Sequence, residues 1–307
     1  MNIFTIIGGD YWHGAIALLA SINRLSVNAR YFIGVEKNVE IPTLPGLDVN
    51  FFELEESPRW IGNRKMELIE RVGCDEFLFI DADCIVTCKS FFALAVDAIR
   101  ECPFLCVEAL VPKDDVRRYW WRKAFEGVCP EADSMIARDV YYNSGLFGGI
   151  QSRDGDVFGR WAALMNKETE FGGKIGELEK FPMPDQDLLN AVLQSYNGSV
   201  RAVSPPDVWF AAGNQHPFLH IGSKGAPLVL HQTGHMKPWR YRAPLARRPN
   251  LYEKVWYELV ESEDNHSSLR FSGSSLLRHW FMDDSVGRAS VISARAWRKA
   301  RSLTGMQ

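Results

Sequence analysis

The stretch FLFIDAD, residues 77–83, sets the organisation of this chain of 307 residues. Four consecutive apolar residues predict a strand that is buried on both faces, as in a parallel sheet. Two carboxylates follow at the end of that strand. Ligand sites in open α/β sheets lie at the carboxyl edge of the strands. The stretch therefore predicts a ligand site at Asp81 and Asp83.

Apolar runs and helical periodicities alternate on both sides of that stretch. Strands that alternate with helices at this pace indicate βαβ units and a parallel sheet, so we expect an α/β protein. The chain is long enough for one large domain with an appendage. The predicted strands cover residues 2–7, 30–36, 48–54, 76–80, 103–108, 140–150 and 227–231, and the predicted helices cover residues 13–24, 57–72, 90–100, 154–167, 185–196 and 250–262.

Two segments fall outside this alternation of strands and helices. The main domain is expected to cover residues 1–262. Residues 110–138 are rich in charged and aromatic side chains, and we interpret them as an insertion near the site; a solvated amphipathic helix is the alternative. Residues 263–307 form a basic, weakly helical tail with seven Arg or Lys and two Asp from Asn265 onward. That part of the tail carries a charge of +5, although the whole chain carries −3.

Composition limits the class of protein and its compartment. The near-neutral net charge argues against a dedicated nucleic-acid-binding protein. Six scattered cysteines without a CxxC pair indicate reduced thiols in a cytoplasmic protein. The N-terminus does not read as a signal peptide, and no apolar run is long enough to predict a spanning helix. Basic and aromatic residues in the tail suggest peripheral contact with the inner membrane surface.

The two acids of residues 77–83 suit a divalent cation. Carboxylates one residue apart repel each other unless a cation lies between them. Oxygen ligands beside a diphosphate suit Mg²⁺ or Mn²⁺, whereas two solvated turn acids are the simpler alternative. Phosphatases of the haloacid dehalogenase type also place two such acids after an apolar strand, and use the first as a nucleophile. This stretch alone does not decide among these alternatives.

The second informative stretch is HQTGHMKPW, residues 231–239. An imidazole at a strand end, here that of His231, can supply a third metal ligand. Gly234 lets the backbone approach a phosphate closely, and Lys237 supplies a point charge for a diphosphate. The pattern therefore favours a site that binds a diphosphate compound together with a metal.

With these residues, the chain resembles glycosyltransferase family 8, which includes glycogenin and bacterial lipopolysaccharide α-galactosyl- and α-glucosyltransferases. The family ends its catalytic domain in His-x-x-Gly-x-x-Lys-Pro-Trp, and residues 231–239 match every fixed position. Residues 142–145 (YNSG) resemble its Asn-Ser/Ala-Gly strand, and residues 184–190 (PDQDLLN) resemble its Asp-Gln-Asp segment at a helix start. Lys65 lies where the family carries a basic residue near the donor. With the two acids, these motifs occur in the family's order.

The resemblance implies a GT-A fold, with a mainly parallel central sheet, flanking helices and a small antiparallel element. It also implies a retaining transfer of a hexose from a UDP-sugar, with an α-linkage and Mn²⁺ or Mg²⁺ as cofactor. Asp81, Asp83 and His231 would hold the metal. The implied catalytic residues are Asp185, Gln186 and Asp187, and the implied donor-binding residues are Gly8, Asp10, Tyr11, Lys65, Asp81, Ala82, Asp83, Asn143, Ser144, Gly234 and Lys237.

Two parts of the chain depart from the family pattern. The nucleotide loop matches only loosely, so either Tyr11 or Trp12 stacks on uracil, and the distance to Gly14 favours Tyr11. Residues 146–149 (LFGG) differ from the usual apolar strand, which leaves the sugar pocket open. Glucose or galactose is the expected sugar, and the expected acceptor is a saccharide, a lipid-linked saccharide or a protein. A non-catalytic nucleotide-sugar-binding protein and the phosphatase remain alternatives.

Overall fold

The computed structural model describes residues 1–37, 39, 47–57, 59–110, 139–166, 184–205, 207–210, 227–233, 237–240 and 251–261. Three sequence expectations concern residues outside these ranges. They are the insertion beyond residue 110, the position of Gly234, and the basic tail from residue 263 onward.

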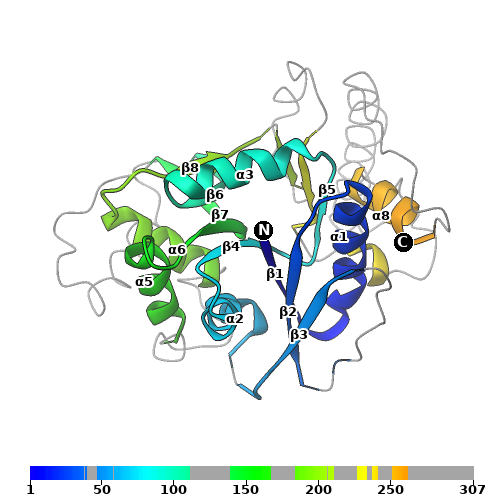
Figure 1. Ribbon diagram of the computed structural model, residues 1–307, viewed down its shortest axis with the longest axis horizontal. Coiled ribbons are helices and arrows are strands. Elements are labelled where there is room, and N and C mark those ends of the chain that lie inside the picture. Colours follow the sequence, from blue (N-terminus) through cyan, green and yellow to red (C-terminus); the bar gives the residue numbers. More distant parts are fainter. Residues whose placement is uncertain are drawn as a thin grey trace, which may run out of the picture.

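A seven-stranded sheet forms the centre of the molecule (Figure 1), in the order β3-β2-β1-β4-β7-β6-β8. Only β7 runs against its neighbours β4 and β6; every other neighbouring pair is parallel. The expected mainly parallel α/β sheet is therefore confirmed. Its strands are β1 (Asn2–Ile7), β2 (Arg30–Glu36), β3 (Val49–Leu54), β4 (Glu76–Ile80), β6 (Phe104–Leu110), β7 (Val140–Ile150) and β8 (Arg201–Val203).

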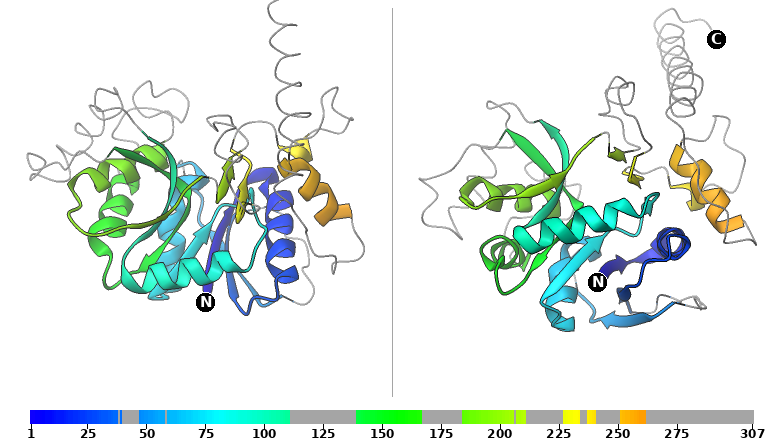
Figure 2. Two further views of the ribbon diagram at one scale, coloured as in Figure 1. Left: turned by 90° about the horizontal axis from the view of Figure 1, so that it is seen from above. Right: turned by 45° about the horizontal axis from the view of Figure 1, so that its top comes forward.

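Helices cover both faces of this sheet (Figure 2). Residues of α1 and α3 pack on one face, and residues of α2, α5 and α6 pack on the other. None of the helices in the described ranges is long and apolar enough to cross a membrane. The helices are α1 (Trp12–Arg24), α2 (Lys65–Val72), α3 (Ser90–Glu101), α5 (Gly155–Asn166), α6 (Pro184–Ser195) and α8 (Leu251–Glu261), with short 3-10 turns η1 (Gly9–Tyr11), η2 (Ile61–Arg64) and η5 (Pro238–Arg240).

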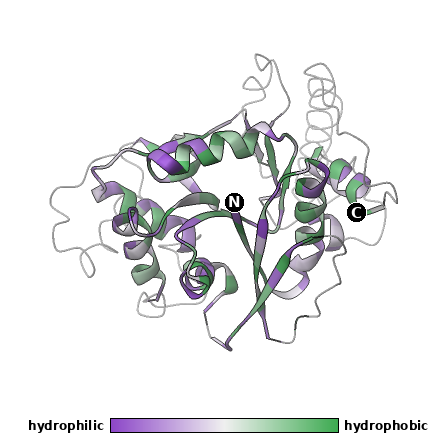
Figure 3. Ribbon diagram, in the orientation of Figure 1, coloured by the Kyte–Doolittle hydropathy of each residue, from purple (hydrophilic) through white to green (hydrophobic). Residues whose placement is uncertain are grey.

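Strand β4 explains why residues 77–80 are all apolar. Phe77 and Phe79 join the core under α2, α5 and α6, whereas Leu78 and Ile80 join the core under α1 and α3. Burying one such side chain stabilises the folded state by about 1.5–3 kcal/mol. Because it buries side chains on both faces, strand β4 packs against both helical layers. Figure 3 shows the same concentration of hydrophobic residues in the central strands. The strand ends at Asp81, which therefore stands at the carboxyl edge of the sheet.

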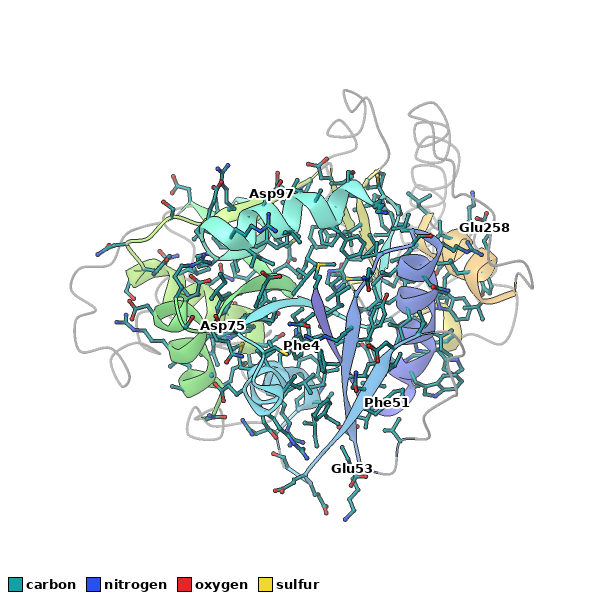
Figure 4. All side chains as sticks on the ribbon, in the orientation of Figure 1. Phe4, Phe51, Glu53, Asp75, Asp97 and Glu258 are labelled. Carbon is teal, nitrogen blue, oxygen red and sulfur yellow. The ribbon has the colours of Figure 1, made fainter. Side chains whose placement is uncertain are left out.

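Burial differs between the middle of the sheet and its edge at β3. In the middle, Phe4 on β1 is fully buried and its ring stacks on Phe32 at 5.0 Å between centroids. At the edge, Phe51 on β3 is 38% exposed. Figure 4 shows Phe4 in the interior, while Phe51 and Glu53 lie on the outlying strand β3. The residues expected at the site lie on the middle strands β4 and β7, away from this edge.

A second, three-stranded sheet lies beside the first, in the order β5-β10-β9. Strand β5 (Cys84–Val86) begins immediately after the two acids, and β10 (Val229–His231) pairs with it in the antiparallel direction. Strand β9 (Val208–Phe210) is parallel to β10. This sheet is the expected small antiparallel element.

Most predicted elements match the structure to within two residues at each end. The predicted helix over residues 57–72 was wrong in its first half, since α2 begins at Lys65 after the turn η2. Gly62 and Asn63 are poor helix formers and lie in that turn. The three-residue strands β5, β8 and β9 were missed because such short runs carry no periodicity.

Candidate active site

The small sheet brings His231 to the two acids. His231 lies opposite Cys84 in the β5–β10 pair, and the Gln232 amide donates to the Asp83 carbonyl at 3.0 Å, which continues the pairing. The imidazole Nε2 consequently lies 3.2 Å from Asp83 Oδ1 and 3.9 Å from Asp81 Oδ2. The three residues expected to bind metal therefore converge, although His231 follows the two acids by about 150 positions along the chain.

Gly145 on β7 leaves room at this meeting point. A Cβ atom there would lie 2.4 Å from Asp81 Oδ2 and 2.5 Å from His231 Cε1, which is closer than real Cβ contacts come. The Asp81 amide also donates to the Gly145 carbonyl at 2.7 Å. Gly145 is thus required for the close approach of β7 to the two side chains.

Lys65 links Asp81 to the start of α6. Its ammonium lies 3.1 Å from Asp81 Oδ1 and 3.0 Å from Asp185 Oδ2, and donates to the Ser144 carbonyl at 3.1 Å. Strand β7 has no pairing partner on β6 from Ser144 to Leu146, so the lysine satisfies a carbonyl that the sheet leaves open. The Lys65 side chain is only 2% exposed, which makes this contact a buried ion-pair cluster.

Lys237 holds the second acid in the same way. Its ammonium is paired with the Asp83 carboxylate and donates to the Gln232 carbonyl. The Lys237 and Asp83 side chains are 3% and 9% exposed. Each acid of residues 77–83 therefore has its own buried lysine, Lys65 for Asp81 and Lys237 for Asp83.

These contacts shift the pKa values of the two acids in opposite directions. Burial raises the pKa of Asp81, and the Lys65 ammonium only partly offsets that effect. Burial opposes ionisation of Asp83 too, but Lys237 and His231 outweigh it and hold the pKa of Asp83 well below its usual range. Asp83 is thus firmly ionised, whereas Asp81 depends more on a nearby cation.

The donor set at this point suits a divalent cation. Two carboxylates and an imidazole converge on space that a Cβ at Gly145 would fill. His231 Nδ1 is buried and has no hydrogen-bond partner in the described part of the chain. The Cys84 thiol belongs to the same cluster, since ligand atoms of Asp83, Cys84 and His231 lie within 4.8 Å of one another. Burial raises the pKa of that thiol well above its usual value, so carboxylate oxygens are the readier ligands.

A network of amides lies next to Lys65. Gln186 Oε1 accepts from Asn143 Nδ2 at 2.9 Å and from the Ser144 amide at 3.4 Å. Gln186 Nε2 and Asn143 Nδ2 both donate to Glu108 Oε2, at 2.6 Å and 3.2 Å. The Asn143 Oδ1 atom accepts from the Gly145 amide at 2.8 Å. Three residues expected from the sequence are thus joined to one that was not, Glu108.

The start of α6 is held against β7 by buried polar contacts. Asp185 Oδ2 accepts from the Ser144 hydroxyl at 2.5 Å, and the Asp185 carbonyl accepts from Trp161 Nε1 at 2.8 Å. Asp187 is 1% exposed and accepts from the Tyr141 hydroxyl at 2.6 Å. Asp185 and Gln186 therefore reach the Lys65 and Asn143 side of the site, while Asp187 contacts Tyr141 in the core.

The N-terminal loop meets the C-terminal segment across Tyr11. The ring of Tyr11 lies 5.3 Å from the Lys237 ammonium and 5.4 Å from the Arg240 guanidinium, measured to the ring centroid. Arg240 also forms a two-point ion pair with Asp10, at 2.7 Å and 2.8 Å. This contact lowers the pKa of Asp10. Asp10 and Tyr11 are thereby connected to the rest of the site through residues 237–240.

Gly8 and Ala82 occupy tightly packed positions. A Cβ at Gly8 would lie 2.7 Å from Ile61 Cγ2 and 2.8 Å from Glu36 Oε2. The Ala82 carbonyl lies against Gly14, where a Cβ would come within 2.5 Å of it. Gly8 therefore makes room for the Ile61 and Glu36 side chains, and Gly14 lets α1 approach the Ala82 backbone closely.

Sequence reasoning missed three residues of this site. Cys84 follows the second acid directly, so its position next to the cluster could have been noticed. Arg240 follows the matched Lys-Pro-Trp segment by one residue, and its charge was the available signal. Glu108 had no signal in the sequence, because a single acid at the end of an apolar strand is common on protein surfaces.

Comparison with known proteins identifies the class of fold. No protein-family profile matches the sequence, and no curated protein matches it either. An active-site mutant of LgtC matches with a TM-score of 0.55 at 16% identity, over 85% of this chain and 95% of that chain. The galactosyltransferase LgtC in complex with donor and acceptor sugar analogs gives 0.51 at 15% identity, over 84% and 95%.

A further match is the glycosyltransferase GlyE of Streptococcus pneumoniae TIGR4, with a TM-score of 0.52 at 17% identity over 91% of this chain and 62% of that one. These neighbours are glycosyltransferases, and at such low identity the likeness establishes the fold. The chain has the GT-A fold of nucleotide-sugar transferases. The fold that the motif resemblance implied is therefore confirmed.

Proposed function

We propose that the protein is a glycosyltransferase that moves a hexose from a UDP-sugar to an acceptor hydroxyl, with retention and an α-linkage. The observation that carries this proposal is the convergence of Asp81, Asp83 and His231 on the space left by Gly145. The GT-A fold supports it, since LgtC with that fold was crystallised with donor and acceptor sugar analogs.

A divalent cation, Mn²⁺ or Mg²⁺, is the proposed cofactor. Asp81, Asp83 and His231 would hold it, with carboxylate oxygens as the hard ligands that such cations prefer. When bound, the metal supplies Lewis-acid stabilisation of the departing diphosphate. The raised pKa of Asp81 fits this role, because a cation beside it favours the ionised form.

We assign to Lys237 the role of neutralising the remaining negative charge of the diphosphate. Gly234 would let the backbone approach the phosphates closely. Lys237 is already next to the metal ligands and to Tyr11, which is the proposed stacking partner of uracil. Asp10 and Gly8 would shape the same nucleotide loop, together with the backbone at Ala82. Positive charge fixed at the leaving group is electrostatic stabilisation of the transition state.

The transfer step breaks the bond between the anomeric carbon and the diphosphate oxygen, and forms one bond to the acceptor oxygen. The acceptor's proton passes to the leaving diphosphate oxygen on the same face, which retains the configuration. Gln186 is placed beneath the anomeric carbon, with Asp185, Asn143 and Ser144 around the sugar hydroxyls. The amide oxygen of Gln186 already accepts two N–H groups, and an amide is a poor nucleophile, so we favour front-face attack.

Asp187 was grouped with the catalytic residues by the family resemblance. Its contact with Tyr141 suggests instead that it anchors α6 beneath Gln186. Lys65 would orient Asp81 and Asp185 together, because its ammonium contacts both carboxylates. The expected donors are UDP-glucose and UDP-galactose, and the expected acceptors are a saccharide, a lipid-linked saccharide or a protein.

The deciding experiment is a screen of UDP-sugars for UDP release by the purified chain, with Mn²⁺ and then with EDTA. Metal-dependent release from one UDP-hexose supports the proposal, and faster release with a saccharide acceptor supports transfer. Tight UDP-sugar binding without release, with or without acceptors, would mean a binding protein. Hydrolysis of phosphate esters with no response to UDP-sugars would mean the phosphatase chemistry of Asp81.

A further inference from the structure

Glu108 occupies a β-bulge in β6. Val107 pairs with Tyr142 and Ala109 pairs with the next residue, Tyr141, so Glu108 is the extra residue on its strand. Bulges redirect the side chain of the extra residue, and they occur often beside active sites. The carboxylate of Glu108 consequently reaches Asn143 and Gln186 across β7.

Glu108 accepts a hydrogen bond from the NH₂ group of each of the two amides. An ionised carboxylate can only accept hydrogen bonds, so it must face the NH₂ group of each amide. Gln186 Nε2 and Asn143 Nδ2 both donate to Glu108 Oε2, which leaves Gln186 Oε1 facing Asn143 Nδ2 and the Ser144 amide. Tyr141 is a further hydrogen-bond partner of the Gln186 side chain, so Glu108 supplies the charged contact to the Gln186 amide.

The attachment of α6 to β7 does not depend on Glu108. Asn190 accepts from the Tyr142 amide at 2.8 Å and donates to the Tyr142 carbonyl at 2.7 Å. Tyr141 and Asp187 add a second buried link at 2.6 Å. Helix α6 is therefore held in place by other residues, and Glu108 contributes only to the orientation of the Gln186 side chain.

We propose that Glu108 is a positioning residue, which fixes the amide of Gln186 with its NH₂ group toward β6 and its oxygen toward β7. The role rests on the proposed function of Gln186 beneath the anomeric carbon. A fixed amide presents one dipole direction to the developing positive charge at that carbon, whereas an amide that can turn presents two. Orientation of this kind affects the transition state more than donor binding.

The first test is kinetic and needs no acceptor. UDP release from UDP-galactose and UDP-glucose with Mn²⁺ is measured for Glu108→Gln, Glu108→Asp, Gln186→Ala and the double variant Glu108→Gln with Gln186→Ala. We expect Glu108→Gln to lower kcat roughly 10- to 100-fold, as for loss of a hydrogen bond to a charged group, with the KM for the donor nearly unchanged. Glu108→Asp should recover part of the loss, because it keeps the charge.

The double variant separates action through Gln186 from a direct or structural role. If Glu108 acts through Gln186, adding Glu108→Gln to Gln186→Ala changes kcat little. If the double variant instead loses kcat by the product of the two single losses, the proposal is overturned. The matched control is Glu101→Gln, which makes the same chemical change at the surface pair with Arg201 and should leave kcat unchanged.

The second test reads the amide itself by NMR. The side-chain NH₂ signals of Gln186 are assigned by their absence in Gln186→Ala. We expect them to shift in Glu108→Gln and to stay close to their original position in Glu108→Asp. Unchanged signals in Glu108→Gln would refute the positioning role whatever the activity. If the unaltered chain releases no UDP from any UDP-sugar, the proposed function fails, and the NMR result still decides the orientation.

Discussion

The Lys237 ammonium is paired with the Asp83 carboxylate in the interior of the site. Asp81 is paired with a different lysine, Lys65, so the two neighbouring acids do not share one cation. This arrangement relieves their repulsion before any metal or substrate binds. Binding of a divalent cation at Asp83 would weaken the hold on Lys237, which then becomes available to a diphosphate. The prediction for Lys237 tests that exchange of partners.

The first prediction concerns Asp83. Asp83→Asn should abolish Mn²⁺-dependent UDP release, with a barrier higher by several kcal/mol, on the order of what a Lewis-acid metal supplies. The change also leaves the Lys237 ammonium without its anion, which costs stability on the order of 3–5 kcal/mol for a buried pair. Thermal unfolding is therefore measured beside activity. Asp97→Asn on the exposed face of α3 is the control. Full activity of Asp83→Asn in metal-free buffer would refute the metal assignment.

Lys237→Ala should have opposite effects on the affinities for UDP and for Mn²⁺. UDP binding should weaken by roughly 1–3 kcal/mol, because a charged hydrogen-bond donor is lost. Mn²⁺ binding without nucleotide should strengthen, by about tenfold, since a buried positive charge no longer competes for Asp83. Calorimetry gives the UDP affinity, and the EPR signal of free Mn²⁺ gives the metal affinity. Unchanged UDP affinity would remove Lys237 from the diphosphate, and weaker Mn²⁺ binding would contradict the exchange of partners.

Much of the fold could be predicted because each long element has a regular pattern. The strand over residues 76–80 has apolar side chains on both faces from Phe77 onward, and the 11-residue strand Val140–Ile150 also agreed in its bounds. The carboxyl edge of the sheet then located Asp81 without any knowledge of its partners. The local hydrophobic pattern was sufficient to predict an element wherever its buried residues recur with the period of a helix or a strand.

The contacts that complete the site depend on pairing between distant segments. Sequence motifs named His231, but they gave no reason for it to reach Asp83; the β5–β10 pair supplies that reason. The unpaired run of β7 that exposes the Ser144 carbonyl to Lys65 is likewise a property of strand register. Register and bulges leave almost no trace in composition, so Glu108 could not be found before the structure.

Gly145 provides a test that leaves every proposed ligand in place. Gly145→Ala puts a Cβ 2.4 Å from Asp81 Oδ2, so the carboxylate or β7 must move. We expect Mn²⁺ affinity to fall about 10- to 100-fold, as when residues supporting a metal ligand are changed. The matched control is Gly159→Ala on the exposed side of α5, where a Cβ meets nothing within 4 Å and helix propensity predicts a gain of about 1 kcal/mol. Equal Mn²⁺ affinity in both variants would show that the metal lies elsewhere.

The last prediction concerns the basic tail, for which the sequence is the only guide. From Asn265 onward it carries +5, with Trp280, Phe281 and Trp297 among the cations, whereas residues 1–264 carry −8. Basic and aromatic residues together favour an anionic membrane surface, which would bring the protein to a lipid-linked acceptor if the proposed function holds. The competing interpretation is that the tail binds the acidic body, because its apolar residues do not fall on one clean helical face.

Flotation with liposomes distinguishes these interpretations of the tail. The full chain and a chain that ends at Glu263 are mixed with anionic vesicles and with neutral phosphatidylcholine vesicles. Membrane contact predicts that only the full chain floats, only with anionic vesicles, and less at high salt because screening weakens the attraction. Equal flotation of both chains, or of neither, would contradict it. A tail bound to the acidic body instead predicts that removing it changes thermal stability in a salt-dependent way without any vesicles.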